Sequence, residues 1–179
     1  MQIEFSQSRP EAVRILAQTT TKGQLPEGLE RAMEEGAKAA RFKGSAGQLF
    51  DGFVEREGKV VRVALAGAGQ PGATDRRANL EKAGGALAAK FLTSGEADIA
   101  LDLSGSDLGA DDAAALLLGL RLRAWRWDEY RTTQKDAEKV SLKSVTVVGA
   151  PDDTQDAWGR ESALADGVEF TKMLVTEPA

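Results

Sequence analysis

Three glycines, Gly67, Gly69 and Gly72, have the spacing that most resembles a chemical site. They match the GxGxxG pattern, follow an expected strand and precede an expected helix. In that arrangement, a tight turn and a helix N-terminus present backbone N–H groups to a phosphate. Pro71 removes one of these N–H groups and disfavours a helical conformation at Gln70. Two interpretations follow, a dinucleotide phosphate loop and a structural strand-to-helix loop, and we favour the second.

Carboxylates form the second candidate set, which consists of Asp98, Asp102, Asp107, Asp111 and Asp112. A hard cation would need such oxygens to converge on one point. On the expected elements, Asp98 and Asp102 lie on the solvent side of a strand. Asp111 and Asp112 instead open a helix, where negative charge is favourable. We therefore predict that these aspartates hold no metal.

The segment from Trp125 to Arg131 interleaves aromatic rings with arginines, a composition that could stack on nucleobases. It follows a leucine-rich helical segment, so we expect its rings to anchor the end of that helix. The net charge of −5 disfavours a nucleic-acid partner, because an acidic chain gains nothing from neutralising phosphates.

The composition excludes several kinds of site. The chain of 179 residues has no His and no Cys, which rules out His-dependent serine triads, His or thiolate metal sites and disulfides. It shows no secretory signal and no apolar run of about 18 residues, the length that spans a membrane. We expect a cytoplasmic protein without membrane contact, and we predict no catalytic, cofactor-binding or metal-ligating residue in this chain.

The elements that must position these residues alternate between strand and helix patterns. Strands are expected at Ile3–Phe5, Ala12–Ala17, Leu49–Glu55, Lys59–Ala66, Ile99–Leu103 and Lys143–Gly149, the third and fourth forming a hairpin. Helices are expected at Pro26–Phe42, Arg76–Leu92, Asp111–Trp125 and Asp153–Val175, with Asp75 as an N-cap and Gly167 as an interruption. This order predicts an α/β fold with a mixed, largely parallel sheet flanked by helices.

Several segments together carry a family resemblance. They are Ala40–Gly44 with Gly47 and Gln48, Val63–Gly67, Leu80–Gly85, Leu116–Arg121, Tyr130–Thr132 and, most specifically, the run Ala165–Ala179. The chain resembles the N-terminal domain of the leucyl aminopeptidases in the cytosol aminopeptidase family. The resemblance implies a macro-domain-like fold for residues 1–150. It also implies that residues 151–179 are a linker helix leading to a catalytic domain that this chain lacks.

The resemblance also sets expectations about activity. The family's catalytic and metal-binding residues lie in D-S-G-G and N-T-D-A-E-G-R segments, which do not occur here, so none can be transferred to this chain. The parent enzyme would bind two divalent metals, Mn or Zn, and release N-terminal amino acids from peptides. This domain would then assist hexamer assembly and active-site access, with its own catalytic domain and sister subunits as partners. The alternative is a macro-like module that binds ADP-ribose or a nucleotide through Gly67–Gly72.

Overall fold

A single six-stranded sheet organises the protein in the computed structural model, which describes residues 1–128, 131 and 133–177. The strands are β1 (Gln2–Ser6), β2 (Ile15–Thr21), β3 (Leu49–Arg56), β4 (Lys59–Gly69), β5 (Asp98–Asp102) and β6 (Ser144–Val148). Their order across the sheet is β1-β6-β5-β2-β4-β3, and every neighbouring pair is parallel except the β3–β4 hairpin.

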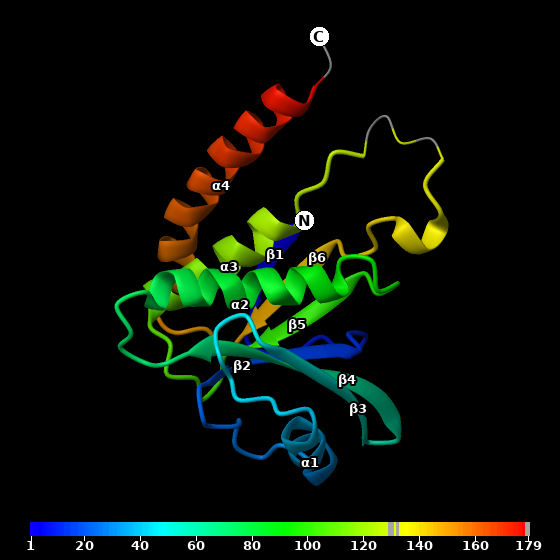
Figure 1. Ribbon diagram of the computed structural model, residues 1–179, viewed down its shortest axis with the longest axis vertical. Coiled ribbons are helices and arrows are strands. Elements are labelled where there is room, and N and C mark those ends of the chain that lie inside the picture. Colours follow the sequence, from blue (N-terminus) through cyan, green and yellow to red (C-terminus); the bar gives the residue numbers. More distant parts are fainter. Residues whose placement is uncertain (129–130, 132, 178–179) are drawn as a thin grey trace.

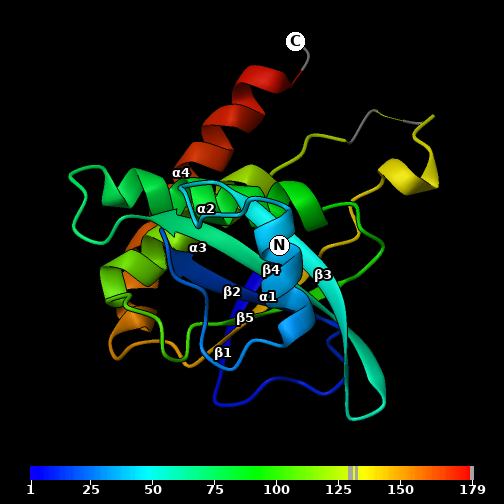
Figure 2. The same ribbon diagram turned by 60° about the horizontal axis from the view of Figure 1, so that its bottom comes forward.

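Helices cover both faces of this sheet (Figures 1 and 2). α2 (Arg76–Phe91) and α3 (Ala110–Ala124) pack on one face and α1 (Arg31–Ala39) on the other, while α4 (Thr154–Thr176) lies against α3. A short 3-10 helix, η1 (Asp136–Glu138), precedes β6. The predicted fold class, a mixed and largely parallel α/β sheet between helices, is confirmed.

The strands at the centre of the sheet are apolar on both faces. In β4, Val63 and Leu65 join the core on the α1 side, whereas Ala64 and Ala66 join the core on the α2 side. The same holds in β5, where Ala100 is fully buried on the α1 side. Our expectation of one buried face for this strand is therefore wrong, because helices cover both sides of a central parallel strand.

α2 and α3 cross with their backbones in direct contact. A Cβ added to Gly84 would lie 1.9 Å from the carbonyl oxygen of Leu116, and one added to Gly119 would lie 2.0 Å from that of Glu81. No side chain fits in either gap, so both positions require glycine. The close approach brings the two helices down together on the sheet as one layer.

The first helix is shorter than expected. Gly28 has a positive φ of 71° and Glu30 is extended, so the chain turns after Pro26 and α1 begins only at Arg31. α1 ends at Ala39, and Arg41 then adopts a left-handed conformation with φ of 55°. Pro26 and the helical spacing of apolar residues predict a helix over Pro26–Phe42, but the turns at both ends restrict α1 to the shorter range.

One further boundary and one helix cap differ from expectation. β2 runs from Ile15 to Thr21 rather than from Ala12 to Ala17, because pairing with both β4 and β5 extends it through a run of polar residues. Asp75 precedes α2 but makes no side-chain cap, and its carboxylate accepts instead from the side chain of Asn79 at 2.9 Å.

The last helix is continuous. α4 passes through Gly167 without a break, so the expected interruption is wrong, and a Cβ at that position would meet open space. Across the described residues, none of the helices combines the length and the apolar character needed to cross a membrane.

Candidate functional site

The hydrogen-bonding groups of the first two loop glycines are already used within the chain. Gly67 and Gly69 belong to β4, beside the segment 44–48. The N–H of Gly67 donates to the carbonyl of Gln48 at 2.8 Å, and the N–H of Gly69 donates to the carbonyl of Gly44 at 3.0 Å. A phosphate at this loop would have to displace both bonds, so the geometry gives no support to the phosphate interpretation.

Close backbone packing and turn geometry explain why these three positions are glycine. A Cβ on Gly67 would lie 2.2 Å from the carbonyl oxygen of Ser45. Gly69 has a φ of 77° at the point where β2 and β4 shift register, and Gly72 has a φ of 72° in the following turn. Each of the three positions therefore needs glycine for the path of the chain.

The aspartates of the acidic set are spread over the sheet and helix ends. Asp98 and Asp102 lie at opposite ends of β5. Asp98 accepts from the hydroxyl of Ser144 at 2.5 Å, and Asp102 accepts from the backbone N–H of Ser104 at 2.9 Å. Each is thus tied to its own strand end, with the length of β5 between them.

Basic residues pair with the three remaining aspartates. The Arg76 guanidinium contacts Asp112 at 2.8 Å and Asp107 at 3.5 Å, while Arg160 of α4 contacts Asp111 at 3.0 Å. In the part of the chain that the structure describes, no three acidic side chains gather closely enough to hold a metal ion. Through its contacts with Asp107 and Asp112, Arg76 connects the start of α2 to the start of α3.

The tryptophans after α3 pack on each other. The rings of Trp125 and Trp127 stack with centroids 6.4 Å apart, and the ammonium group of Lys172 lies 5.4 Å from the Trp125 ring. This arrangement agrees with rings that anchor a helix end rather than a platform for bases. Tyr130 of the same segment lies outside the described residues.

Two clefts open along the edge of the sheet where the parallel strands end. The first, of about 510 Å³, lies between the ends of β2 and β5; we call it the switch-point cleft, and it is lined by Gln18–Thr21, Gln24–Glu27, Asp102 and Ser104–Asp107. The second, of about 570 Å³, lies beside the start of α4 and includes Asp152, Asp153 and Asp156. Neither cleft has a Lys or Arg among its lining residues, but Asp107 of the switch-point cleft pairs with Arg76.

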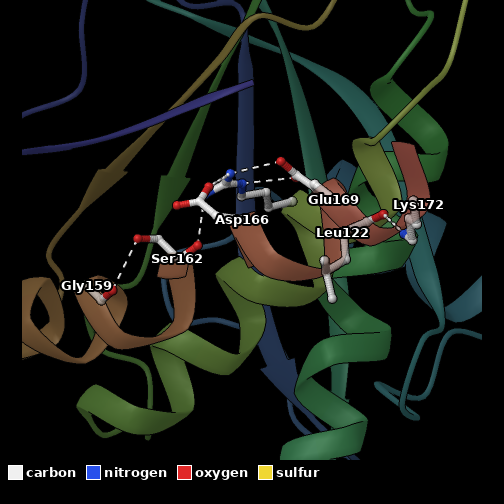
Figure 3. A network of polar contacts seen from close by, with 7 residues as sticks. Leu122, Gly159, Ser162, Asp166, Glu169 and Lys172 are labelled. Atoms are coloured by element: carbon white, nitrogen blue, oxygen red, sulfur yellow. Dashed lines mark hydrogen bonds and ion pairs between the residues drawn. The ribbon is translucent and has the colours of Figure 1, made fainter. Parts of the chain in front are cut away.

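One face of α4 is held against the body mainly by charged contacts (Figure 3). Arg121 of α3 binds Glu169 at 2.9 Å and also pairs with Asp166, and it reaches the carbonyl of Ser162. Lys172 donates to the carbonyl of Leu122 at 3.3 Å. The hydrogen bond with Glu169, opposed by burial, raises the pKa of Arg121, so this guanidinium stays charged.

A second contact joins α4 to α2. Glu161 and Arg77 form two parallel hydrogen bonds, both 2.8 Å long. The hydrogen bond from Arg77 lowers the pKa of the Glu161 carboxyl below its ordinary value of 4.5, against the smaller effect of burial. α4 is therefore attached to both helices of the layer beneath it.

The opposite face of α4 has no partner among the described residues. Phe170 and Leu174, one turn apart on this face, are 57% and 58% exposed. Leu164 is 51% exposed and lies to the side of them, about 80° or more around the helix. In the same helix only Thr154, Ala157 and Ala165 are buried. In Figures 1 and 2 the C-terminal half of α4 extends beyond the body of the molecule. An apolar stripe on a projecting helix is typical of an interface.

Comparison with known proteins decides the family. The sequence profile described as the cytosol aminopeptidase family, N-terminal domain, matches residues 13–134. This chain belongs to that family. As an aminopeptidase N-terminal domain, it is similar to a probable cytosol aminopeptidase of Xanthobacter autotrophicus, with 34% identity over 157 residues. That match covers 87% of this chain and 31% of the relative. A probable cytosol aminopeptidase of Caulobacter vibrioides is 36% identical over 149 residues, covering 83% and 29%.

Solved structures show the same fold for this aminopeptidase domain. A mutant of tomato leucine aminopeptidase superimposes with a TM-score of 0.72 at 20% identity, covering 100% of this chain and 39% of that one. The bottromycin maturation enzyme BotP in complex with Mn gives 0.70 at 23% identity, covering 93% and 32%. The chain thus spans about a third of the length of the relatives that it matches.

Several residues of this domain were not identified as important from the sequence. Arg121 and Arg76 each bind two carboxylates, but the partners lie 31 to 48 positions away along the chain. Nothing near Gly84 in the sequence indicates why this position must be glycine. The switch-point cleft is formed by two loops that only the strand order brings together, so no local pattern could have indicated it.

Proposed function

We propose that this chain is the non-catalytic N-terminal domain of a metal-dependent leucyl aminopeptidase that acts in the cytoplasm. Residues 1–150 form the folded domain in this proposal, and residues 151–179 form the connector to the catalytic domain. The family match supports the first part, together with relatives about three times as long. The domain contributes to assembly of a hexamer and to access to the active site of the parent enzyme.

The two unlike faces of α4 are the observation that carries the connector role. One face is fixed to α3 and α2 by Arg121 and Arg77, so the direction of the helix is set by the domain. The other face presents Phe170 and Leu174 to solvent. A helix that is anchored on one side and apolar on the other is suited to carry a second domain against its exposed stripe.

The chemistry of the parent enzyme lies outside this chain in our proposal. Two divalent metals would activate water in the catalytic domain. The described residues offer no group of three acidic side chains for a metal. The Gly67–Gly72 loop serves as structure, because its N–H groups at Gly67 and Gly69 bind the segment 44–48.

Hydrolysis of leucine p-nitroanilide in the presence of manganese or zinc tests the catalytic part of the proposal. We expect this chain to show no turnover above a matched blank. Metal-dependent turnover that survives repurification would contradict the proposal. A full-length relative, assayed in parallel, provides the positive control for substrate and metal.

The connector role is tested on the exposed stripe of α4. Replacing both Phe170 and Leu174 with Ser should change the free energy of unfolding by less than about 0.5 kcal/mol, as is usual for surface positions. It should also lower the fluorescence of a dye that binds exposed apolar surface. Ala165→Ser, on the buried face of the same helix, is the destabilising control. A large loss of stability in the double variant would show that the stripe packs within the chain, against the proposal.

A further inference from the structure

The strand β3 forms one edge of the sheet, and in the described part of the chain only β4 pairs with it. β3 is eight residues long, pairs with β4 in unbroken register and contains no Pro or Lys. Short length, bulges, proline and lysine are features that commonly keep an edge strand from pairing with another chain. β1, at the opposite edge, has only five residues. β3, which lies at the margin of the molecule in Figure 2, is therefore the edge more open to a further strand.

The turn of the hairpin determines which backbone groups of β3 face this open edge. A two-residue turn at 57–58, with positive φ angles of 52° and 73°, joins Arg56 to Lys59, which are paired across it. In such a hairpin the pair beside the turn exchanges both ladder hydrogen bonds, and every second residue along the strand does the same. The residues between them direct their N–H and C=O groups to the open edge, namely Asp51, Phe53 and Glu55. Among the described residues, these backbone groups make no hydrogen bond outside the hairpin.

An aromatic ring is exposed at the same edge. Phe53 is 66% exposed and pairs in register with Arg62 of β4, whose guanidinium lies 5.3 Å from the centre of the Phe53 ring. Arg62 also lies 5.0 Å from the ring of Phe91 at the end of α2, which places Phe53 on the α2 side of the sheet. Val60, two positions before Arg62 and on the same side, is 63% exposed. Large apolar side chains exposed beside an open strand edge indicate a contact surface.

The charges beside Phe53 favour a second copy of this chain as the partner. Asp51 binds Arg62 at 2.6 Å and Lys90 of α2 at 2.8 Å, so two cations face one carboxylate. Glu55 is exposed and has no ion-pair partner among the described residues. If two β3 strands run antiparallel with their Phe53 residues opposite each other, Asp51 of each chain lies opposite Glu55 of the other. The two carboxylates at each end of the contact are then balanced by two cations.

We propose that the β3 strands of two copies of this chain pair antiparallel about a two-fold axis beside Phe53 and join the two sheets into one. The two Phe53 rings form a cross-strand aromatic pair, and the backbone groups of Asp51, Phe53 and Glu55 form the ladder between the chains. Because each chain uses the same edge, the contact closes at two copies. It does not depend on the connector role of α4 or on a catalytic domain, since its residues belong to β3, β4 and α2.

Sedimentation velocity of this chain, at concentrations up to about 1 mM so that even a weak contact is populated, tests the proposal. We expect the mass to rise with concentration from one chain to two and no further. Phe53→Asp should raise the Kd of the dimer about tenfold or more, because it removes the aromatic pair and adds like charges to the edge. Phe170→Asp is the matched control, since Phe170 is 57% exposed on α4, and it should change the Kd less than about twofold.

Glu55→Lys tests the charge pattern without touching the core, because this side chain is exposed, and it should also raise the Kd. Glu4→Lys makes the same charge change at the opposite edge, on β1, and should leave the Kd unchanged. Circular dichroism of each variant shows whether the comparisons are made on folded protein.

Hydrogen exchange reports on the backbone pairing itself. The amides of Asp51, Phe53 and Glu55 should exchange more slowly as the protein concentration rises, while exchange in β1 stays the same. A chain that remains a monomer, or exchange along β3 that does not depend on concentration, would overturn the proposal. A dimer that Phe170→Asp weakens as much as Phe53→Asp would overturn it as well, because the contact would then lie on α4.

Discussion

α3 makes two helix contacts that differ in kind. Against α2 it packs backbone to backbone, because Gly84 and Gly119 leave no room for a Cβ. Against α4 it makes ion pairs and hydrogen bonds through Arg121, and α4 buries few of its own side chains. The first contact excludes water and tolerates no added atom, whereas the second keeps charged groups partly in solvent.

These two kinds of contact predict different stabilities for the α2–α3 layer and for α4. Close-packed contacts in the interior change steeply with volume, so the layer formed by α2 and α3 should open only when the domain unfolds. Partly exposed ion pairs are screened by salt and contribute little each. α4 can therefore loosen while the rest of the domain stays folded, which suits a connector between domains.

The largest expected effect is on the contact between α2 and α3. Gly84→Ala should lower the free energy of unfolding by about 3 kcal/mol, because the added Cβ overlaps the carbonyl of Leu116. Gly85→Ala is the matched control, since a Cβ there has neighbours no closer than 3.8 Å and alanine favours a helix. Urea denaturation measures both. Equal stability of the two variants would show that the backbone contact is not close.

A second backbone contact tests whether the glycine loop follows the same rule. Gly67→Ala should cost about 2 kcal/mol, because its Cβ would overlap the carbonyl of Ser45. Gly72→Ala should cost about 1 kcal/mol, since its φ is positive but its surroundings are open. A phosphate loop would instead lose nucleotide binding in both variants. Saturable NAD binding by the wild-type chain, lost on either substitution, would contradict a structural loop.

These contacts mark the limit of what the sequence could predict. Hydrophobic spacing located α2, α3 and α4 and the hairpin, because each depends on neighbours within one turn or one strand pair. Gly84 and Gly67 could not be explained in the same way, because the atoms that they approach belong to α3 and to segment 44–48. For the loop, GxGxxG spacing alone cannot distinguish a phosphate site from a close backbone approach.

A moderate effect is expected where α4 meets α3. Arg121→Met keeps the aliphatic packing but removes the pairs with Glu169 and Asp166, which should cost about 1 kcal/mol or less because both partners are partly exposed. Amide exchange should rise along α4 and stay unchanged in α2. Arg123→Met, an exposed change on the same helix, should leave exchange unaltered. If exchange rises equally in α2, α4 is not a separate unit.

The smallest expected effect is the pH dependence of the contact between α4 and α2. The hydrogen bond from Arg77, against a smaller opposing effect of burial, lowers the pKa of Glu161 below its ordinary value of 4.5. A carboxyl whose pKa is lower in the folded state stabilises the fold above the unfolded value, and loses that contribution as pH falls through the folded value. Arg77 is about half exposed, so we expect its pair with Glu161 to contribute only about a few tenths of a kcal/mol to the free energy of unfolding.

Glu161→Gln separates this pair from the other carboxyls that titrate in the same direction. The pKa values of Glu30 and Asp51 are also lowered, but these groups bind β3, β4 and the C-terminal end of α2 rather than α4. In the wild-type chain, amide NMR signals of α4 should shift as pH falls from neutral to values below 4.5, because the pKa of Glu161 is lowered. In Glu161→Gln that shift should be absent near residue 161, while signals of β3 still move. Identical titrations in both proteins would mean that the pair with Arg77 does not hold α4, leaving its contacts with α3 as the attachment.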